Sequence, residues 1–527
     1  MLARRSFIGR VGLGVIGCGV APSRLTLVAD GGAVGNALPR ATPESQGVSS
    51  TGILSFLKSL EGGPHELHSL MILRHGKVIA EGWWAPYQPE YNHGMYSMSK
   101  SFTSTAIGLA VDEERLTVED KVISFFPKSI PAKISDHLAA MRVKDLLTMS
   151  AGQDSSATGK TVAVENWVEA FLGLPVPNAP GSVFNYNSAA TYMLSAIVQK
   201  VSGDSVLDYL TSRLFKPLGI TGPYWETCPR GINTGGWGLH IRTEGLVRFG
   251  QLLLQKGVWN GRRIISEEWI AEATSKQIQQ PKTEKSNADW VQGYGYQFWR
   301  CRHGAYRGDG AFGQFTIVLP EQDAVIVMTG ESPSMQGELD LVWEHLLPAF
   351  QNTRLIDGGK TSAKLENVLG SLSIPLPEGT KSSAIAKRID AKSYQIEKNS
   401  LGIERVSFRF EGNDCSVTLV GKLGQQVVRC RMGGWKFSEA AVPGTPPRII
   451  SGGAPAPGTP ARIVAAGAWP KTKQFVMHWR YYETPHHDTV TCDFDGDGVS
   501  IGFLDSISKA RGRGKDARPI IRGTLSC

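Results

Sequence analysis

Hydrophobic residues recur with helical spacing in several segments between residues 38 and 354. Residues 97–114 are so apolar on every side that they predict a helix buried in a core rather than one lying on a surface. Shorter periodic segments predict helices over 143–149, 191–201 and 243–256, and a glycine closes each of the last two. The middle of this region is therefore expected to be helical.

Strand patterns stand at the two ends of the same region. Residues 69–82 predict a β-hairpin that turns at His75-Gly76. Residues 312–319 and 324–329 predict two further strands, joined by the turn sequence Pro-Glu-Gln-Asp. Strands at both ends with helices between them predict one sheet, built from the two ends of the domain and flanked by helices, in an α/β (α+β) fold.

The pattern changes after residue 354. Residues 355–384 are polar and contain proline and glycine, which predicts a linker. Residues 385–527 offer short alternating segments separated by turn residues, which predicts a C-terminal antiparallel β-domain, either a sandwich or a small barrel. The interval 441–466 is rich in proline, glycine and alanine and predicts a long loop. The expected strands are 406–410, 415–419, 426–430, 475–479, 489–494 and 498–503.

Residues 1–37 have the pattern of an export signal. A basic start is followed by a short apolar run, which is typical of a signal peptide. The string Arg4-Arg-Ser-Phe-Ile8 resembles a twin-arginine signal, which exports folded proteins, and an ordinary secretory signal is the alternative. Cleavage would follow Ala33 or Ala37, while a lipoprotein box ending at Cys18 is a second alternative. We therefore expect a periplasmic, cell-surface or extracellular protein.

The composition adds few constraints. The 527 residues are 41% hydrophobic and 20% charged, which is ordinary for a globular protein with room for two or three domains. The net charge of +8 is spread along the chain, apart from a small basic cluster over 509–518 that we interpret as a solvated face or tail. We therefore expect no nucleic-acid partner, whereas association with an anionic cell-wall polymer would suit the mild positive charge. The oligomeric state is left open.

The seven cysteines show no C-x-x-C spacing, so the sequence predicts neither a zinc site nor a redox motif, and we expect no cofactor. Cys415 and Cys430 lie in neighbouring expected strands. They are left as either a disulfide pair or two free thiols.

Ser97 and Lys100 form the main candidate pair for chemistry. Residues three apart at a helix start face the same way, so Lys100 presents its amine beside the Ser97 hydroxyl. A serine needs an adjacent base to act as a nucleophile, and a lysine can serve if burial lowers its pKa. The helix start also offers the N–H of Ser97 to a developing oxyanion. For this short motif alone, the alternative is a solvated helix start.

Two further strings carry candidate residues. Tyr186 lies in a loop that leads into the helix over 191–201, where a tyrosine can aim its phenol into a cleft. Beside an ammonium its pKa would fall, which would suit a phenolate or a proton relay, and a packing role is the alternative. The string Tyr306–Gln314 places glycines beside a strand, where a substrate can approach the backbone closely. One N–H near Ala311 would complete an oxyanion hole, unless this is a simple hairpin turn.

Together these strings resemble the serine β-lactamase and penicillin-binding-protein-like hydrolases, in the branch of class C β-lactamases, esterases and 6-aminohexanoate-dimer hydrolases. The family order of S-x-x-K, then Y-x-N or Y-x-S, then a glycine-containing strand appears as Ser97-x-x-Lys100, Tyr186-x-Ser188 and Gly308–Gln314. The likeness spans roughly residues 40–350. Further familiar strings stand between these motifs at Val143–Gly152, Pro180–Phe184 and Gly235–Leu239.

The resemblance implies a β-lactamase-like α/β domain over 38–354 with a mixed sheet flanked by helices and a helical subdomain, and acyl-enzyme chemistry. Ser97 would attack an ester or amide carbonyl, and Lys100 and Tyr186 would shuttle the proton. The N–H groups of Ser97 and Ala311 would bind the oxyanion, and Ser188 would help to bind the substrate.

Two departures from the family pattern narrow the expected function. No Lys-Thr-Gly or His-x-Gly string is present, and Arg307 stands nearby as a candidate clamp for a substrate carboxylate. The second motif ends in Ser188 rather than asparagine. We therefore expect an esterase or amidase that acts on a small or short oligomeric ester or amide. The alternatives are a penicillin-binding or sensor-type protein that acylates without turnover, a D-amino-acid peptidase or β-lactamase, and a β-domain that binds carbohydrate or lipid.

Other patterns are interpreted as structural. Asp493–Gly498 begins like a calcium loop, but Leu504 stands where the last carboxylate is needed, so we expect a β-turn. His65–His68 is one residue short of H-E-x-x-H and is expected to be a loop. His486-His487-Asp488 shows no matching partner along the chain, so no metal site is expected there. The tryptophans expected to be packing residues are Trp167, Trp237 and Trp299, of which the first and last would also suit a cleft mouth.

Overall fold

The computed structural model describes residues 37–356, 359–450 and 458–526 of the chain. The arginine string at residues 4–8, Cys18 and the cleavage position after Ala33 lie outside these residues, so the export signal stays a prediction. Among the described residues, no helix has both the length and the hydrophobicity that crossing a bilayer requires.

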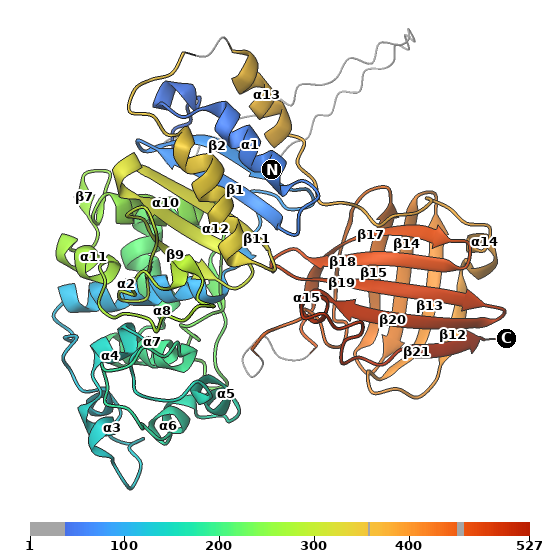
Figure 1. The fold of residues 1–527 in the computed structure, drawn as a ribbon. Coiled ribbons are helices and arrows are strands. Elements are labelled where there is room, and N and C mark those ends of the chain that lie inside the picture. Colours follow the sequence, from blue (N-terminus) through green and yellow to red (C-terminus); the bar gives the residue numbers. More distant parts are fainter. Residues whose placement is uncertain (1–36, 357–358, 451–457, 527) are drawn as a thin grey trace, which may run out of the picture. The chain divides into compact units, whose positions relative to one another are not determined.

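The central sheet joins the two ends of the first domain, as the sequence predicts. Its strand order is β2-β1-β11-β10-β9-β8, and Figure 1 shows the blue N-terminal strands beside the yellow later ones. All neighbouring strands pair antiparallel, so the sheet is not mixed in direction. The strands are β1 Glu66–Arg74, β2 Lys77–Trp83, β8 Trp299–Arg300, β9 Tyr306–Gly310, β10 Gln314–Leu319 and β11 Ala324–Glu331. Short strands elsewhere in the domain are β3 His93–Gly94, β4 Tyr224–Trp225, β5 Leu239–Ile241, β6 Val258–Trp259 and β7 Arg262–Arg263.

Strand β1 begins earlier than expected. The hairpin turns at His75 and Gly76, as predicted, and both residues have positive φ angles of 49° and 70°. However, the strand starts at Glu66 and includes His68, so the expectation of a loop over 65–68 is wrong for most of that segment. The sequence did not indicate this start, because Glu66 and His68 are polar residues of the kind that occur in exposed loops. In the structure they bond to one another and are not exposed to solvent as loop residues would be.

The sheet is covered on both faces because alternate residues of its strands point in opposite directions. In β1, Met71 and Leu73 belong to one core, whereas Leu70 and Ile72 belong to another. The first core includes helices α2 (Ser99–Asp112) and α10 (Thr243–Leu254), and the second includes α1 (Ser50–Leu60). The expected helices over 97–114, 143–149, 191–201 and 243–256 are found with ends shifted by no more than three residues.

The remaining helices complete the helical subdomain and the flanks of the sheet (Figure 1). They are α3 Asp136–Ala140, α4 Val143–Leu147, α5 Ala157–Val162, α6 Trp167–Leu172, α7 Ser188–Ser202, α8 Val206–Leu210, α9 Lys216–Leu218, α11 Glu267–Thr274, α12 Met335–Leu341 and α13 Lys360–Leu369. Two short helices, α14 Ala386–Ile389 and α15 Ser506–Ala510, belong to the C-terminal region. Helix α13 lies inside the expected linker over 355–384. Its Leu365 is buried in the same core as α1, so this part of the segment packs on the first domain.

The C-terminal region forms a closed β-barrel, one of the two architectures that the sequence left open. Nine strands follow one another in the order β15-β14-β13-β12-β21-β20-β19-β18-β17, and a parallel pairing of β15 with β17 closes the ring. Strand β16 pairs with β17 at the side of the ring. The strands are β12 Lys392–Ile396, β13 Ile403–Glu411, β14 Asp414–Gly421, β15 Gly424–Met432, β16 Lys436–Ala440, β17 Ala461–Lys471, β18 Gln474–Tyr481, β19 His487–Asp495, β20 Gly498–Asp505 and β21 Ile521–Leu525.

Each expected strand of the barrel is present, and the Asp493–Gly498 string forms the turn between β19 and β20 as predicted. The loop expected over 441–466 is too long, because β17 begins at Ala461. This strand is buried through its middle without alternation, so it lacks the pattern that marks a half-exposed strand. Cys415 and Cys430 lie opposite one another in β14 and β15 as free, buried thiols.

Candidate active site

Ser97 lies in a short 3-10 turn, Tyr96–Met98, that leads directly into α2. Tyr96 has a φ angle of 45°, in the left-handed region that residues other than glycine seldom adopt. The turn is fixed from outside, because the N–H of Met95 donates to the carbonyl of Leu239 in β5. The start of α2 therefore presents Ser97 on a strained, anchored turn, a feature that is common at functional sites.

The Lys100 amine contacts the Ser97 hydroxyl, as the spacing of the two residues predicts. Its Nζ atom lies 3.0 Å from Ser97 Oγ, 2.9 Å from Ser188 Oγ and 2.7 Å from the carbonyl oxygen of Gly236. The lysine is only 1% exposed. Burial lowers the pKa of Lys100 to about 7, and the charge of Asp309 opposes this shift. A substantial fraction of the amine is therefore neutral near pH 7, with a lone pair beside the hydroxyl.

Tyr186 completes the group around the lysine. Its ring centroid lies 4.9 Å from Lys100 Nζ, and the ring stacks on Trp299 at 5.6 Å. Burial raises the pKa of the Tyr186 phenol, the charge of Asp309 raises it further, and the hydroxyl contact with Ser97 lowers it by less. The expectation that this pKa would fall is therefore wrong, because burial and the charge of Asp309 both disfavour a phenolate. Tyr186 is a neutral phenol in this site.

The end of strand β9 lies against the nucleophile turn. A Cβ atom built on Gly310 would stand 2.0 Å from the carbonyl oxygen of Met95 and 3.1 Å from the amide nitrogen of Met98. A Cβ on Gly308 would meet Met98 Sδ at 2.4 Å. Only glycine permits this approach, which brings Ala311, the next residue after β9, to the turn that carries Ser97.

Arg307 does not face the site as a carboxylate clamp, and that expectation is wrong. Its side chain is fully buried, and its Nε atom donates to Asp309 Oδ2 at 2.9 Å. Its Nη1 atom donates to the carbonyl oxygen of Asp289 and to Cys301 Sγ. The guanidinium also lies 4.2 Å from the ring of Trp290. These partners hold Nε and Nη1 inside the domain, while Nη2 is buried without a hydrogen-bond partner in the described structure.

Asp309 is a site residue that sequence reasoning missed. It is 6% exposed and lies within electrostatic reach of both Lys100 and Tyr186. Burial raises the pKa of the Asp309 carboxyl, whereas Arg307 and Lys100 lower it. The signal was present as Arg307-x-Asp309, because residues two apart in a strand share a face. Asp309 of this pair places a buried carboxyl group within electrostatic reach of Lys100.

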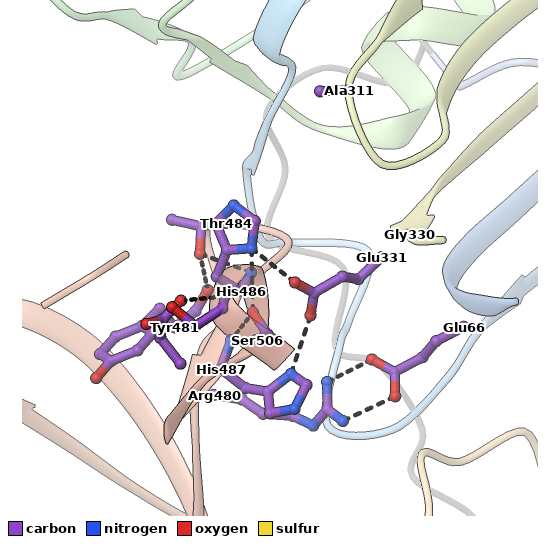
Figure 2. A network of polar contacts seen from close by, with 12 residues as sticks. Glu66, Ala311, Gly330, Glu331, Arg480, Tyr481, Thr484, His486, His487 and Ser506 are labelled. Carbon is purple, nitrogen blue, oxygen red and sulfur yellow. Dashed lines mark hydrogen bonds and ion pairs between the residues drawn. The ribbon is translucent and has the colours of Figure 1, made fainter. Parts of the chain in front are cut away.

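Figure 2 shows that His486, His487 and their neighbours in the β-domain have polar partners, although the sequence offered none. His486 and His487 both bond to Glu331 at the end of β11, at 2.7 and 2.9 Å. Asp488 is held by both Nη atoms of Arg518, so this arginine of the basic cluster is not solvated as expected.

A metal ion is not indicated at this junction. Ligand atoms of Glu66, Glu331 and His487 lie within 4.8 Å of one another. However, both carboxylate oxygens of Glu66 accept bonds from Arg480, at 2.7 and 2.9 Å (Figure 2). The guanidinium already neutralises the carboxylate that a cation would need, and its own charge would repel the ion.

A cavity of about 640 Å³ borders the nucleophile turn. It has the size of an ordinary small-molecule site, and Tyr96 and Trp237 line it from the first domain. The β-domain contributes Arg448, Tyr481 and other residues to the opposite wall. Charges of both signs are present, so the lining does not select an anionic or a cationic ligand: Glu226, Glu439, Glu483, Arg448 and Arg462.

The same segment of the chain matches a known protein family. A family model described as Beta-lactamase covers residues 68–346, which is more than half of the chain. The chain belongs to the Beta-lactamase family. The matched region contains the nucleophile turn, Lys100, Tyr186 and β9, so the family resemblance inferred from the three strings is confirmed.

Individual relatives in this hydrolase family are distant. The 6-aminohexanoate-dimer hydrolase of Paenarthrobacter ureafaciens is 24% identical over 56% of this chain and 80% of its own length. A solved structure called a putative 6-aminohexanoate-dimer hydrolase from Bacillus anthracis is 20% identical, with a TM-score of 0.48 over 59% of this chain and 86% of its own. A family VIII carboxylesterase is 16% identical, with a TM-score of 0.47 over 59% and 99% of the two chains. At these scores neither structure bears on the reaction of this chain.

Proposed function

We propose that this protein is a serine hydrolase that forms an acyl-enzyme at Ser97 with ester or amide substrates. The observation that carries the proposal is the Lys100 amine, which is buried, has its pKa lowered to about 7 and lies 3.0 Å from Ser97 Oγ. A buried lysine in contact with a serine at a strained helix start is the arrangement that an activated nucleophile needs.

In the acylation step, neutral Lys100 takes the proton of the Ser97 hydroxyl as Oγ bonds to the substrate carbonyl carbon. The electron pair of the carbonyl moves to oxygen, where the N–H groups of Ser97 and Ala311 stabilise the negative charge. The tetrahedral intermediate then collapses, and the leaving group departs with a proton. Tyr186 is a neutral phenol, so it can donate its own proton to the leaving group and recover one from Lys100.

Deacylation reverses the same transfers with water in place of the leaving group. Lys100 takes a proton from water as the water oxygen bonds to the acyl carbon. The bond from that carbon to Ser97 Oγ then breaks, and the protonated Lys100 amine returns its proton to Oγ, so that Ser97 leaves as the alcohol and the amine is neutral again. Ser188 Oγ contacts Lys100 at 2.9 Å, so it holds the amine toward Ser97 during both half-reactions. The Gly236 carbonyl fixes the amine from another side.

The relative named a 6-aminohexanoate-dimer hydrolase supports an amide or ester of a short oligomeric acid as the substrate class. The family motif Lys-Thr-Gly is absent from this chain, and Arg307 is occupied by Asp309, so neither offers a β-lactam carboxylate its usual partner. The proposal is therefore an esterase or amidase rather than a β-lactamase.

Covalent labelling tests this function directly. We expect a fluorophosphonate probe to add one phosphonyl group to the intact protein, because Ser97 Oγ attacks phosphorus and displaces fluoride. Peptide mass spectrometry should place the adduct on Ser97. A parallel panel of p-nitrophenyl esters, amides of 6-aminohexanoate and nitrocefin should show turnover of the first two classes. An unlabelled protein that turns over none of these substrates refutes the proposal, and acylation that persists without turnover identifies a sensor-type protein instead.

The rate of labelling and of ester hydrolysis should depend on pH through Lys100. Because the amine must be neutral to accept a proton, kcat/KM should fall about tenfold per pH unit below a pKa near 7 and level off above it. The raised pKa of Tyr186 means that its phenol imposes no loss of activity between pH 7 and 9. A profile measured from pH 5 to 9 that is flat, or that falls with rising pH, would contradict the assignment of Lys100 as the base.

A further inference from the structure

His486 of the β-barrel reaches the nucleophile turn of the first domain. Its side chain is fully buried, and its Nε2 atom lies 2.5 Å from the Tyr96 hydroxyl. Its Nδ1 atom lies 2.7 Å from Glu331 Oε1, and Ser506 Oγ stands nearby at 3.2 Å (Figure 2). One histidine of the β-domain therefore touches the residue that directly precedes Ser97.

The partners define the direction of each hydrogen bond at the imidazole. Glu331 is a carboxylate, because His486 and His487 hold its pKa far below the usual range, so it accepts the Nδ1–H. Burial raises the pKa of Tyr96, so its phenol keeps its proton and donates it to Nε2. The result is a directed chain in which Tyr96 donates to His486 and His486 donates to Glu331.

The same imidazole packs against Phe312. The two rings meet edge to face, with centroids 4.8 Å apart at an angle of 89°. Phe312 also contacts Tyr96, with ring centroids 5.8 Å apart. His486, Tyr96 and Phe312 thus form one cluster of three mutually touching rings.

Both first-domain members of this cluster have a strained backbone. The φ angle is 45° at Tyr96 and 69° at Phe312, in the left-handed region that residues other than glycine seldom adopt. Such conformations persist only where surrounding contacts over-determine them. The two strained residues are also the immediate neighbours of the two proposed oxyanion donors, since Tyr96 precedes Ser97 and Phe312 follows Ala311.

We propose that His486 is a positioning residue that fixes the relative positions of the two oxyanion donors, the N–H groups of Ser97 and Ala311. Its hydrogen bond fixes the Tyr96 side of the site, and its ring edge fixes the Phe312 side. The β-barrel then contributes a residue that determines the geometry of the active site. This inference rests on the proposed serine hydrolase function.

The junction offers a matched control, because two neighbouring contacts join the domains without touching the ring cluster. Arg480 binds both carboxylate oxygens of Glu66, and His487 Nδ1 bonds to Glu331 Oε2 at 2.9 Å. His487 shares the carboxylate partner of His486, yet within the described residues it makes neither a hydrogen bond nor a ring contact with Tyr96 or Phe312. A variant at His487 therefore weakens the domain contact and leaves the oxyanion neighbours in place.

The test compares His486→Phe, Tyr96→Phe, the double variant and His487→Gln in the full chain. His486→Phe keeps a ring against Phe312 but removes the bonds to Tyr96 and Glu331, whereas Tyr96→Phe removes only the hydroxyl from the other side. We expect each of the first two to lower kcat for p-nitrophenyl ester hydrolysis about 10- to 100-fold, with KM changed less than about twofold, because a misplaced oxyanion donor acts on the transition state. The double variant should lose no more activity than the more impaired of the two single variants, because both substitutions break the hydrogen bond between Tyr96 and His486.

The fluorophosphonate labelling rate should fall in parallel with kcat, while His487→Gln retains wild-type values. Tyr96→Phe keeps the inference testable if His486→Phe does not fold. If the wild-type chain is labelled at Ser97 but kcat is unchanged in Tyr96→Phe, the inference about His486 is overturned while the proposed function stands. An equal loss in His487→Gln would also overturn it, because the effect would then reflect domain contact in general. A wild-type chain that is never labelled refutes the proposed function and the inference with it.

Discussion

Replacing Ser97 with alanine is expected to lower kcat for ester hydrolysis by about 10⁴-fold or more, and to abolish labelling by the fluorophosphonate probe. The substitution removes the only atom that bonds to the substrate carbonyl, and serine hydrolases lose activity on this scale when the nucleophile is removed. The oxyanion donors and the neighbouring cavity remain, so the affinity for substrate should be unaffected. Steady-state kinetics on p-nitrophenyl esters, with intact mass spectrometry for labelling, measure both results.

Ser104→Ala is the matched control for this substitution. Ser104 lies in the same helix and is fully buried, and within the described structure its hydroxyl has no hydrogen-bond partner. It therefore reports the effect of removing a buried serine hydroxyl from α2 without touching the proposed chemistry. We expect wild-type kinetics from this variant. Normal turnover in Ser97→Ala, or an equal loss in Ser104→Ala, would show that Ser97 is not the nucleophile.

The pairing of Ser97 with Lys100 was predictable because it depends on local geometry alone. A spacing of three residues at a helix start places the two side chains together whatever the rest of the fold does. The lowered pKa of Lys100 was also predictable in direction, since a lysine inside an apolar helix loses its hydration. The central hairpin and the first helix of the site were predictable for the same reason, because their patterns are contained in one segment.

The roles of Tyr186 and Arg307 depend on three-dimensional surroundings that no local pattern records. The pKa of Tyr186 rises because the phenol is desolvated and faces Asp309, whereas the sequence suggested only a nearby ammonium. Arg307 stands near the glycine-containing strand, where the sequence suggested a carboxylate clamp, but its Nε–H donates to Asp309 on the same strand face. Asp309 contributes in both cases, and its proximity to Lys100 appears only after the sheet is formed.

The contact of the β-domain with the site was beyond sequence reasoning for a different reason. Tyr96 and His486 are separated by 390 positions, and neither stands in a pattern that points to the other. Polar side chains between strands are usually solvated, so the histidines appeared to be without partners. Their burial and their carboxylate partner, Glu331, emerge only when β11 of the first domain meets the start of β19.

Replacing Lys100 with methionine is expected to lower kcat about 10³-fold and to remove the dependence of activity on a group with a pKa near 7. Methionine fills a similar volume but has no lone pair that accepts the Ser97 proton, and general-base catalysis contributes about 10²–10⁴-fold. Thermal unfolding should show a melting temperature at or above that of the wild type, because the buried amine that the fold must keep largely neutral has been removed. A Lys100→Met variant that loses activity but keeps its stability would show that the buried amine serves catalysis and does not stabilise the fold.

Lys100→Arg separates the base from the charge. A guanidinium stays protonated at every pH used, so it keeps a cation in the pocket but cannot accept the serine proton. If the lysine acts as the base, this variant should be as slow as Lys100→Met and should show no rise in activity through pH 7. If instead Lys100 acts only as a cation that stabilises the oxyanion, Lys100→Arg should retain most of the activity and Lys100→Met should not. The two outcomes are opposite, so the pair of variants decides which property of the buried amine the site uses.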